Sequence, residues 1–287
     1  RQRQMCIRDR AKVNCMRISE VLTADSVPET RAEGQPPLKG GIRLKGVSYR
    51  YPAGSDDALS GIDMEILPGQ KIAFIGGTGS GKSTVVRLLL GLASPTGGEL
   101  SFDGIPAETL GERRLRENIS CVLQRDTIFS GTIRENVLAG REAEDAKVLR
   151  AVSDAQLIDF VEAQKEGLDY PTTQRGGNLS GGQKQRLAIA RALLKPAAIY
   201  IFDDSFSALD FLTESRLRAC LAERLKGKTQ IIVTQRVTTA MNCDKIYVFD
   251  GGRIDAGGTH EELMRSCGIY REIYLSQTRR SAPETGR

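Results

Sequence analysis

The stretch that decides the fold of this chain is GGTGSGKST, residues 76–84. It fits the pattern G-x-x-x-x-G-K-[S/T] of a phosphate-binding loop. Glycines allow backbone N–H groups to approach a polyphosphate closely, and they accept positive φ angles. The lysine adds a point charge for the β- and γ-phosphates, and the hydroxyl that follows suits Mg²⁺. The predicted site comprises Gly76, Gly77, Thr78, Gly79, Ser80, Gly81, Lys82, Ser83 and Thr84, with Ser83 as the metal ligand.

The segments on either side of this loop occur in the order that it requires. Residues 71–75 are an apolar run, as in a buried strand, and apolar residues then recur at helical spacing from Val85 to Leu92. A helix that begins directly after the loop directs N–H groups and a partial positive charge at an anion. A chance glycine-rich turn would not explain both neighbours, so the sequence predicts a nucleotide-phosphate site.

Composition fits a globular protein and argues against a nucleic-acid partner. The chain has 287 residues, of which 40% are hydrophobic and 27% charged, enough for a substantial core. Its net charge of +5 comes from residues 1–10 and 278–287, and the body between them carries no net charge. A neutral body lacks the basic footprint of nucleic-acid binding. The six cysteines show no metal-ligand spacing and indicate a reducing compartment.

Strands and helices alternate along the body, which predicts an α/β fold with a mainly parallel sheet in three layers. Alternating or continuous apolar residues define the strands, and helical spacing defines the helices. Predicted strands are residues 42–51, 62–66, 71–75, 99–102, 119–123, 197–202 and 229–234 with a hairpin over 245–254, and predicted helices are residues 85–92, 132–165, 184–194 and 213–225 with more after 258.

The two ends of the chain differ from this body. Residues 11–22 have apolar residues at helical spacing, and residues 23–41 are rich in proline and glycine, as in a linker. We therefore expect residues 1–41 to be a tail that holds the end of a helix from an upstream domain. The domain itself is expected to span 42–276, followed by a disordered basic tail over 277–287.

A second group of motifs lies in the C-terminal half. The apolar strand Ile199–Asp203 ends in a carboxylate, and LSGGQ at 179–183 precedes it together with its helix. With these motifs the chain resembles the nucleotide-binding domain of ABC transporters, of the exporter type with a fused membrane domain, over about residues 11–275. The resemblance rests on the Walker A loop 76–84, Gln124 of the Q-loop, the signature 179–183, Walker B 200–203 and the D-loop 207–210, with further matches at Tyr51, 129–136 and 258–263.

The resemblance implies a fold and a role for several residues. The fold would be that of phosphate-loop ATPases, with an antiparallel β subdomain and a helical subdomain inserted at about 125–185. Tyr51 would stack on the adenine of ATP, while Gln124 and Asp203 would contact Mg²⁺. By themselves, Tyr51 is equally well a packed strand tyrosine and Gln124 an ordinary strand-end residue. In the signature, Ser180, Gly181, Gly182 and Gln183 would direct N–H groups at a γ-phosphate bound by the opposite subunit, although a simple helix N-cap also explains Ser180.

Two positions depart from the family pattern, and both belong to the hydrolytic site. The family usually has Glu after the Walker B aspartate, where this chain has Asp204, one methylene shorter. The family has His in the switch loop, where this chain has Gln235, which cannot carry a positive charge or shuttle a proton. We expect Asp204 and Gln235 to make a weak catalytic pair while ATP still binds. The one histidine, His260, is expected to be structural.

These features are most similar to one half of a heterodimeric ABC exporter. The intact signature would complete the active site of a second half-transporter, whose own Walker B glutamate and switch histidine would be present. Two alternatives stay open: a regulatory module that binds ATP with negligible turnover, and a soluble ABC ATPase that acts on nucleic acid or ribosomes. On the favoured interpretation the domain works at the cytoplasmic face of the membrane, attached through its own membrane domain.

Overall fold

A computed structural model describes residues 37–52, 54, 56–124 and 126–279. The predicted upstream helix and most of the linker, in residues 1–36, lie outside the described residues, as does most of the basic tail. The last described helix, α11 (Gly268–Arg279), continues past residue 276, where the sequence placed the end of the domain.

The centre of the domain is a six-stranded sheet in the order β12-β11-β3-β10-β9-β6. Five neighbouring strands run parallel, and the last strand of the hairpin pairs antiparallel at one edge. The predicted mainly parallel sheet is therefore confirmed. Its strands are β3 (Lys71–Gly76), β6 (Ile119–Val122), β9 (Ile199–Asp203), β10 (Thr229–Val233), β11 (Lys245–Asp250) and β12 (Arg253–Gly258).

Both faces of this sheet are buried, and each has its own hydrophobic core. In β3, Ile72 and Phe74 belong to a first core, whereas Ala73 and Ile75 belong to a second core. This alternation follows from the two-residue period of a strand. Covering layers on both faces also explain why the parallel strands are continuous apolar runs rather than alternating ones.

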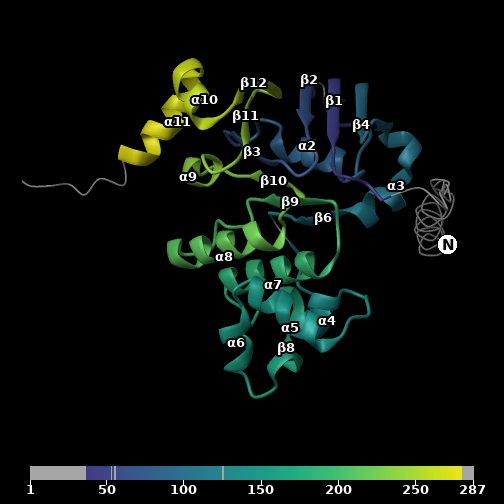
Figure 1. Ribbon diagram of the computed structural model, residues 1–287, viewed down its shortest axis with the longest axis vertical. Helices are drawn as coiled ribbons and strands as arrows, with labels where there is room; N and C mark the ends of the chain where they lie inside the picture. Colours follow the sequence, from purple (N-terminus) through teal and green to yellow (C-terminus); the bar gives the residue numbers. More distant parts are fainter. Residues whose placement is uncertain (1–36, 53, 55, 125, 280–287) are drawn as a thin grey trace, which may run out of the picture. The chain divides into compact units, whose positions relative to one another are not determined.

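An antiparallel sheet and the loop helix cover the first core (Figure 1). The sheet has the order β2-β1-β4-β5, and its buried residues alternate along β1, as the sequence predicted. A short helix that the sequence did not predict, α3, packs Leu110 and Leu115 against the same core. The elements are β1 (Ile42–Arg50), β2 (Asp57–Ile66), β4 (Gly97–Phe102), β5 (Ile105–Pro106), α2 (Lys82–Leu89) and α3 (Ala107–Asn118).

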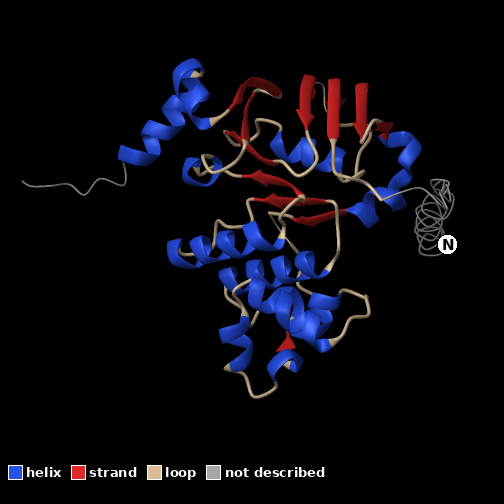
Figure 2. Cartoon of the chain, viewed as in Figure 1, coloured by secondary structure: helices blue, strands red, loops and turns tan. Residues whose placement is uncertain are grey.

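Helices cover the second core on the other face (Figure 2). The predicted helical stretch 132–165 is three separate helices, because the chain turns at Ala139, which has a left-handed φ of 47°, and again after Asp154. The elements of this layer are β7 (Gly131–Thr132), α4 (Ile133–Leu138), α5 (Asp145–Asp154), α6 (Ile158–Glu162), β8 (Pro171–Thr172), α7 (Gly181–Leu194), α8 (Phe211–Arg224), α9 (Val237–Ala240), α10 (His260–Ser266) and α11.

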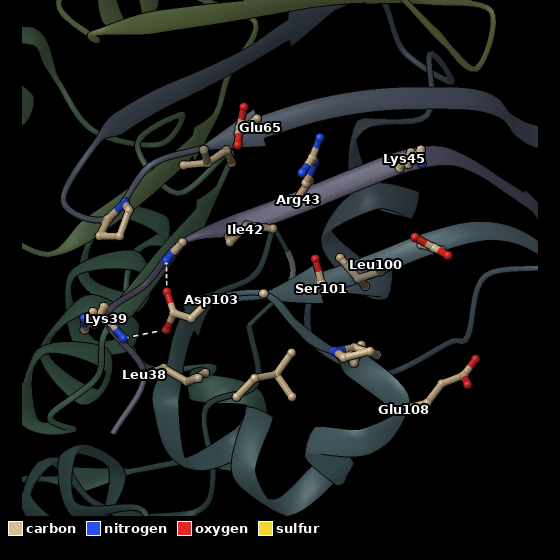
Figure 3. A pocket seen from close by; sticks show the side chains of 18 of the residues that line it. Leu38, Lys39, Ile42, Arg43, Lys45, Glu65, Leu100, Ser101, Asp103 and Glu108 are labelled. Carbon is tan, nitrogen blue, oxygen red and sulfur yellow. Dashed lines mark hydrogen bonds between the residues drawn. The ribbon is translucent and has the colours of Figure 1, made fainter. Parts of the chain in front are cut away.

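The chain enters the domain through a hydrogen-bonded segment, residues 38–41. The Asp103 carboxylate accepts from the backbone N–H of Lys39 at 2.6 Å and of Gly41 at 2.7 Å (Figure 3). Thr229, at the start of β10, donates its hydroxyl to the Gly40 carbonyl at 2.8 Å. A hollow of about 960 Å³ lies beside this entry segment. Its lining contains none of the residues predicted to bind nucleotide.

Asn136 organises the start of the helical layer. Its side chain is 1% exposed and lies in the second turn of α4. The amide accepts from the Phe129 N–H and donates to the Phe129 carbonyl, both at 2.9 Å, and also donates to the Thr172 hydroxyl at 2.9 Å. The Arg191 guanidinium on α7 donates to the same amide oxygen at 3.1 Å. A single buried amide thus joins α4, the loop before it, β8 and α7.

We expect Asn136→Ala to destabilise the domain by about 2–3 kcal/mol, because it leaves several buried polar groups without partners. Chemical denaturation would measure the difference in the free energy of unfolding. Gln164→Ala is the matched control, because the Gln164 amide donates only locally, to the Phe160 carbonyl of helix α6, which it follows. Equal losses in the two variants would contradict this role for Asn136.

Candidate functional site

The phosphate loop connects β3 to α2, and close packing requires its two outer glycines. Gly76 has a φ of 154°, and a Cβ there would lie 2.2 Å from the carbonyl oxygen of Phe249. Gly81 has a φ of 101°, and a Cβ there would lie 2.7 Å from Leu59 Cδ2. At Gly77, by contrast, a Cβ would meet no atom of the described chain within 4 Å. The outer glycines therefore serve packing, and the middle of the loop faces open space.

Lys82 is held at the centre of the loop. Its ammonium donates to the carbonyl oxygens of Gly76 at 2.9 Å and Gly77 at 2.7 Å, and to Ser80 Oγ at 2.9 Å. Since an ammonium has three donors, these contacts satisfy all of them. Burial lowers the pKa of Lys82 below its ordinary value of 10.5, and two nearby carboxylates oppose that change. A bound polyphosphate would replace some of these loop partners with stronger anionic ones.

Those carboxylates belong to Asp203, the last residue of β9, and to Asp204, which follows it. Asp203 is 6% exposed, and the Ser83 hydroxyl lies close enough to favour its ionised form. Burial raises the pKa of Asp203 above 3.8; the Ser83 hydroxyl lowers it, and the charge of Asp204 raises it further. Burial also raises the pKa of Asp204, against the attraction of Arg236. The paired hydroxyl and carboxylate of Ser83 and Asp203 are hard oxygen donors.

Tyr51 contacts the loop helix. Its hydroxyl lies 3.1 Å from Thr84 Oγ1, and the Arg87 guanidinium carbon lies 5.9 Å from the centre of its ring. Tyr49 packs its ring edge-on against Tyr51 at 5.0 Å between centroids. Tyr51 is 37% exposed. Tyr51 therefore lies next to the phosphate loop, where the predicted stacking on adenine stays a prediction.

The Q-loop and the switch loop meet the same edge of the sheet. Gln124 Nε2 donates a long hydrogen bond, 3.5 Å, to Asp204 Oδ2. Gln235 follows β10, whose last residue, Val233, pairs with Asp203 on one side and Phe74 on the other. This register brings the switch loop beside both the phosphate loop and the two carboxylates. The Gln235 side chain is exposed.

An ion pair next to Gln235 was missed by sequence reasoning. Arg236 contacts Glu214 on α8 at 2.5 Å and donates to the Ser207 carbonyl of the D-loop at 3.2 Å. Glu214 is 5% exposed and also accepts from Thr239 Oγ1 at 2.9 Å. Two reasons explain why the sequence did not reveal this pair. A glutamate on a helix is normally expected to face solvent, and residues 214 and 236 are too far apart in sequence for any local pattern to connect them. The pair could be found only from the fold.

The signature begins helix α7 with a capping box. Ser180 Oγ accepts from the Gln183 N–H at 3.2 Å, and Gln183 Oε1 accepts from the Ser180 N–H at 2.7 Å. The N-cap interpretation of Ser180 is thus confirmed. Helix α7 packs in the second core, whereas α2 packs in the first core, across the sheet. One chain therefore presents its signature and its phosphate loop from different layers.

His260 lies apart from this group of residues. Its Nδ1 is 2.8 Å from the Tyr270 hydroxyl, and its ring packs against Tyr274 at 5.5 Å between centroids. These contacts join α10 to α11, in agreement with the expected structural role.

Comparison with known proteins agrees with this geometry. The family model described as ABC transporter matches residues 59–207. A protein named ATP-dependent lipid A-core flippase from Bordetella pertussis is 39% identical over 261 residues, which are 89% of this chain and 42% of that protein. The uncharacterized ABC transporter ATP-binding protein YfiB of Bacillus subtilis is 39% identical over 279 residues, 96% of this chain and 48% of that protein.

A solved structure of a bacterial Atm1-family ABC exporter with ATP bound superposes with a TM-score of 0.82 at 32% identity, over 87% of this chain and 46% of that one. The fold and its site thus define an ABC-type ATPase domain. The chain belongs to the ABC transporter family, and its resemblance is to the ATP-binding domain of exporters. It spans less than half the length of these relatives. Among the described residues, no helix has the length and apolar character needed to cross a membrane.

We expect Asp203→Asn to raise the free energy of unfolding of the nucleotide-free domain. The raised pKa means that the folded state binds the Asp203 proton more tightly than the unfolded state, so ionisation favours unfolding. The gain from Asn should therefore grow as pH rises from 3.8 to the raised folded pKa and stay constant above it. Denaturation curves at several pH values would test this. A loss of stability at neutral pH would contradict the prediction.

Proposed function

We propose that this chain is the ATP-binding domain of one half of a heterodimeric exporter, with a weak hydrolytic site of its own and a competent signature for its partner. The observation that carries the proposal is the combination of an intact phosphate loop and capped signature with Asp204 and Gln235 in the hydrolytic positions. The names of relatives, a flippase and an exporter, support transport across a membrane. The domain would then act at the cytoplasmic membrane face, attached to its own membrane domain.

Several contacts support binding of ATP with Mg²⁺. Lys82 is preorganised for the β- and γ-phosphates, and Tyr51 lies beside the loop helix, where it would stack on adenine. Ser83 and Asp203 lie near each other and offer the oxygen ligands that Mg²⁺ prefers, with Gln124 as a third candidate near Asp204. The ion would neutralise phosphate charge when bound.

Weak hydrolysis follows from what the two departing residues can do. A general base that orients water commonly contributes about 10²–10⁴-fold in rate. The Asp204 backbone is fixed by its N–H bond to the Val233 carbonyl at 2.9 Å, and its side chain is one methylene shorter than that of Glu. Gln235 can donate a hydrogen bond to a phosphate, but it cannot move a proton. The same departures would also fit a regulatory module that binds ATP with negligible turnover.

The signature supports a role in a second subunit. A helix N-terminus favours an anion by about 0.3–1 kcal/mol, and by about 2 in good geometry. Because α7 and α2 lie on opposite faces of the sheet, the phosphate that meets this N-terminus would come from another nucleotide-binding domain. A Cβ at Gly181 would lie 3.5 Å from Ala208 Cβ, an ordinary contact, so this position can be altered without a clash.

We expect Gly181→Asp to lower ATP hydrolysis by the assembled transporter at least about tenfold, because a carboxylate would repel the γ-phosphate at an electrostatic site. ATP binding by this chain should stay unchanged. Gly97→Asp adds the same charge at an open position, where a Cβ would meet Ser48 Cβ at 3.9 Å, and serves as the control. Unchanged hydrolysis in Gly181→Asp would refute the role of the signature.

We expect Asp204→Glu combined with Gln235→His to raise hydrolysis by the complex with the partner at least about tenfold, because it restores a longer carboxylate and a proton-carrying side chain. The rate is to be measured for both single variants, the double variant and the wild type. Asp204 has a left-handed φ of 48°, which Asp tolerates better than Glu, so thermal unfolding should accompany the assay. No gain in a stably folded double variant would exclude these residues as the cause of weak turnover and favour the regulatory alternative.

A further inference from the structure

Gln277, near the end of helix α11, contacts the switch loop. Its amide Nε2 donates to the carbonyl oxygen of Gln235 at 2.6 Å. Its Oε1 accepts from the backbone N–H of Val237 at 2.9 Å. The two bonds span the residue between them, so one amide holds the backbone of the switch loop on both sides of Arg236. We call this pair of bonds the Gln277 clamp.

Gln277 lies at the end of one face of helix α11, and other residues of that face fix the helix in place. Residues 270, 273, 274 and 277 recur at the spacing that places side chains on one face of a helix. Tyr270 is 0% exposed and bonds to His260, while Tyr274 packs its ring on the same histidine. Helix α11 contacts α9, which begins at Val237, and Figure 1 shows it ending near that helix. Gln277 is thus presented to the switch loop by a fixed support.

Other bonds fix the loop in the same region. The Arg236 guanidinium is held by Glu214 and by the Ser207 carbonyl, and the Arg236 N–H donates to Thr234 Oγ1 at 3.0 Å. The loop backbone is therefore anchored to α8, the D-loop and α11 together. Between these anchors, Gln235 extends into an exposed position.

We propose that Gln277 is a positioning residue for Gln235, which rests on the proposed function that this site binds ATP. A glutamine side chain has three rotatable bonds, so it meets a phosphate reproducibly only when its backbone is fixed. The Gln277 clamp supplies that fixed backbone, and it lets the Gln235 amide donate to the terminal phosphate of ATP. ADP lacks this phosphate. The clamp should therefore contribute to the preference of the site for ATP over ADP and not to nucleotide affinity in general.

The test measures dissociation constants for ATP and ADP in the full-length transporter, with a partner whose phosphate-loop lysine is replaced so that only this chain's site binds. Gln277→Ala should lower the preference for ATP by about threefold to tenfold, the scale of one hydrogen bond, with ADP affinity unchanged. Gln277→Glu should do the same, because a carboxylate cannot donate to the Gln235 carbonyl. Thr278→Ala should leave the preference intact, because the Thr278 hydroxyl donates to the Tyr274 carbonyl within the same helix.

A double-mutant cycle separates positioning from a general effect on folding. Gln235→Ala keeps the clamped backbone but removes the side chain that the clamp positions, so adding Gln277→Ala to it should cause no further loss of preference. An unchanged preference in Gln277→Ala, an equal loss of ATP and ADP affinity, or additive losses in the cycle would overturn the inference. A wild-type site that binds neither nucleotide would instead overturn the proposed function, and this inference with it.

Discussion

Two backbone hydrogen bonds at the ends of parallel strands hold the two carboxylates, the switch loop and the phosphate loop next to one another. The Asp204 N–H donates to the Val233 carbonyl at 2.9 Å, and the Thr234 N–H donates to the Phe74 carbonyl at 3.0 Å. They extend the pairing of β9 with β10, and of β10 with β3, one step beyond the strands. The carboxylates, the switch loop and the phosphate loop are consequently neighbours, although about 160 residues separate Gly76 of the phosphate loop from Gln235 of the switch loop. The ends of parallel strands commonly bind ligands for this reason.

Three charged groups, Lys82, Asp203 and Asp204, are partly buried at the same edge of the sheet, and burial disfavours their charged forms. Burial lowers the pKa of Lys82 and raises those of Asp203 and Asp204, so each group is less stable in its charged form there than in water. Shifts of this kind gather at sites that later receive a charged ligand. In this domain, Lys82 offsets part of the cost through its loop contacts, and Ser83 does so for Asp203 through its hydroxyl. On the proposed function, these contacts would prepare the site for phosphate and a cation.

Motifs of local sequence were sufficient to predict the phosphate loop, the Walker B strand, the signature and most strands, because each depends on residues close together in the chain. The three-helix division of 132–165 and helix α3 were not predicted. The first depends on a left-handed Ala139. The second depends on a mixed sequence in which Leu110 and Leu115 are the only buried apolar residues of α3. The pairing of Arg236 with Glu214 and the contact of Gln277 with Gln235 depend on distant segments. Such contacts follow from the packed fold and leave no spacing in the sequence.

The entry segment has a mechanical consequence. Its backbone is tied to Asp103, which follows β4, and to Thr229, which begins β10. Tension applied to residue 38 would therefore be divided between the antiparallel sheet and the central one. Strand β10 is five residues long and leads directly into the segment that carries Gln235. A force on the entry segment would therefore reach the switch loop through one strand.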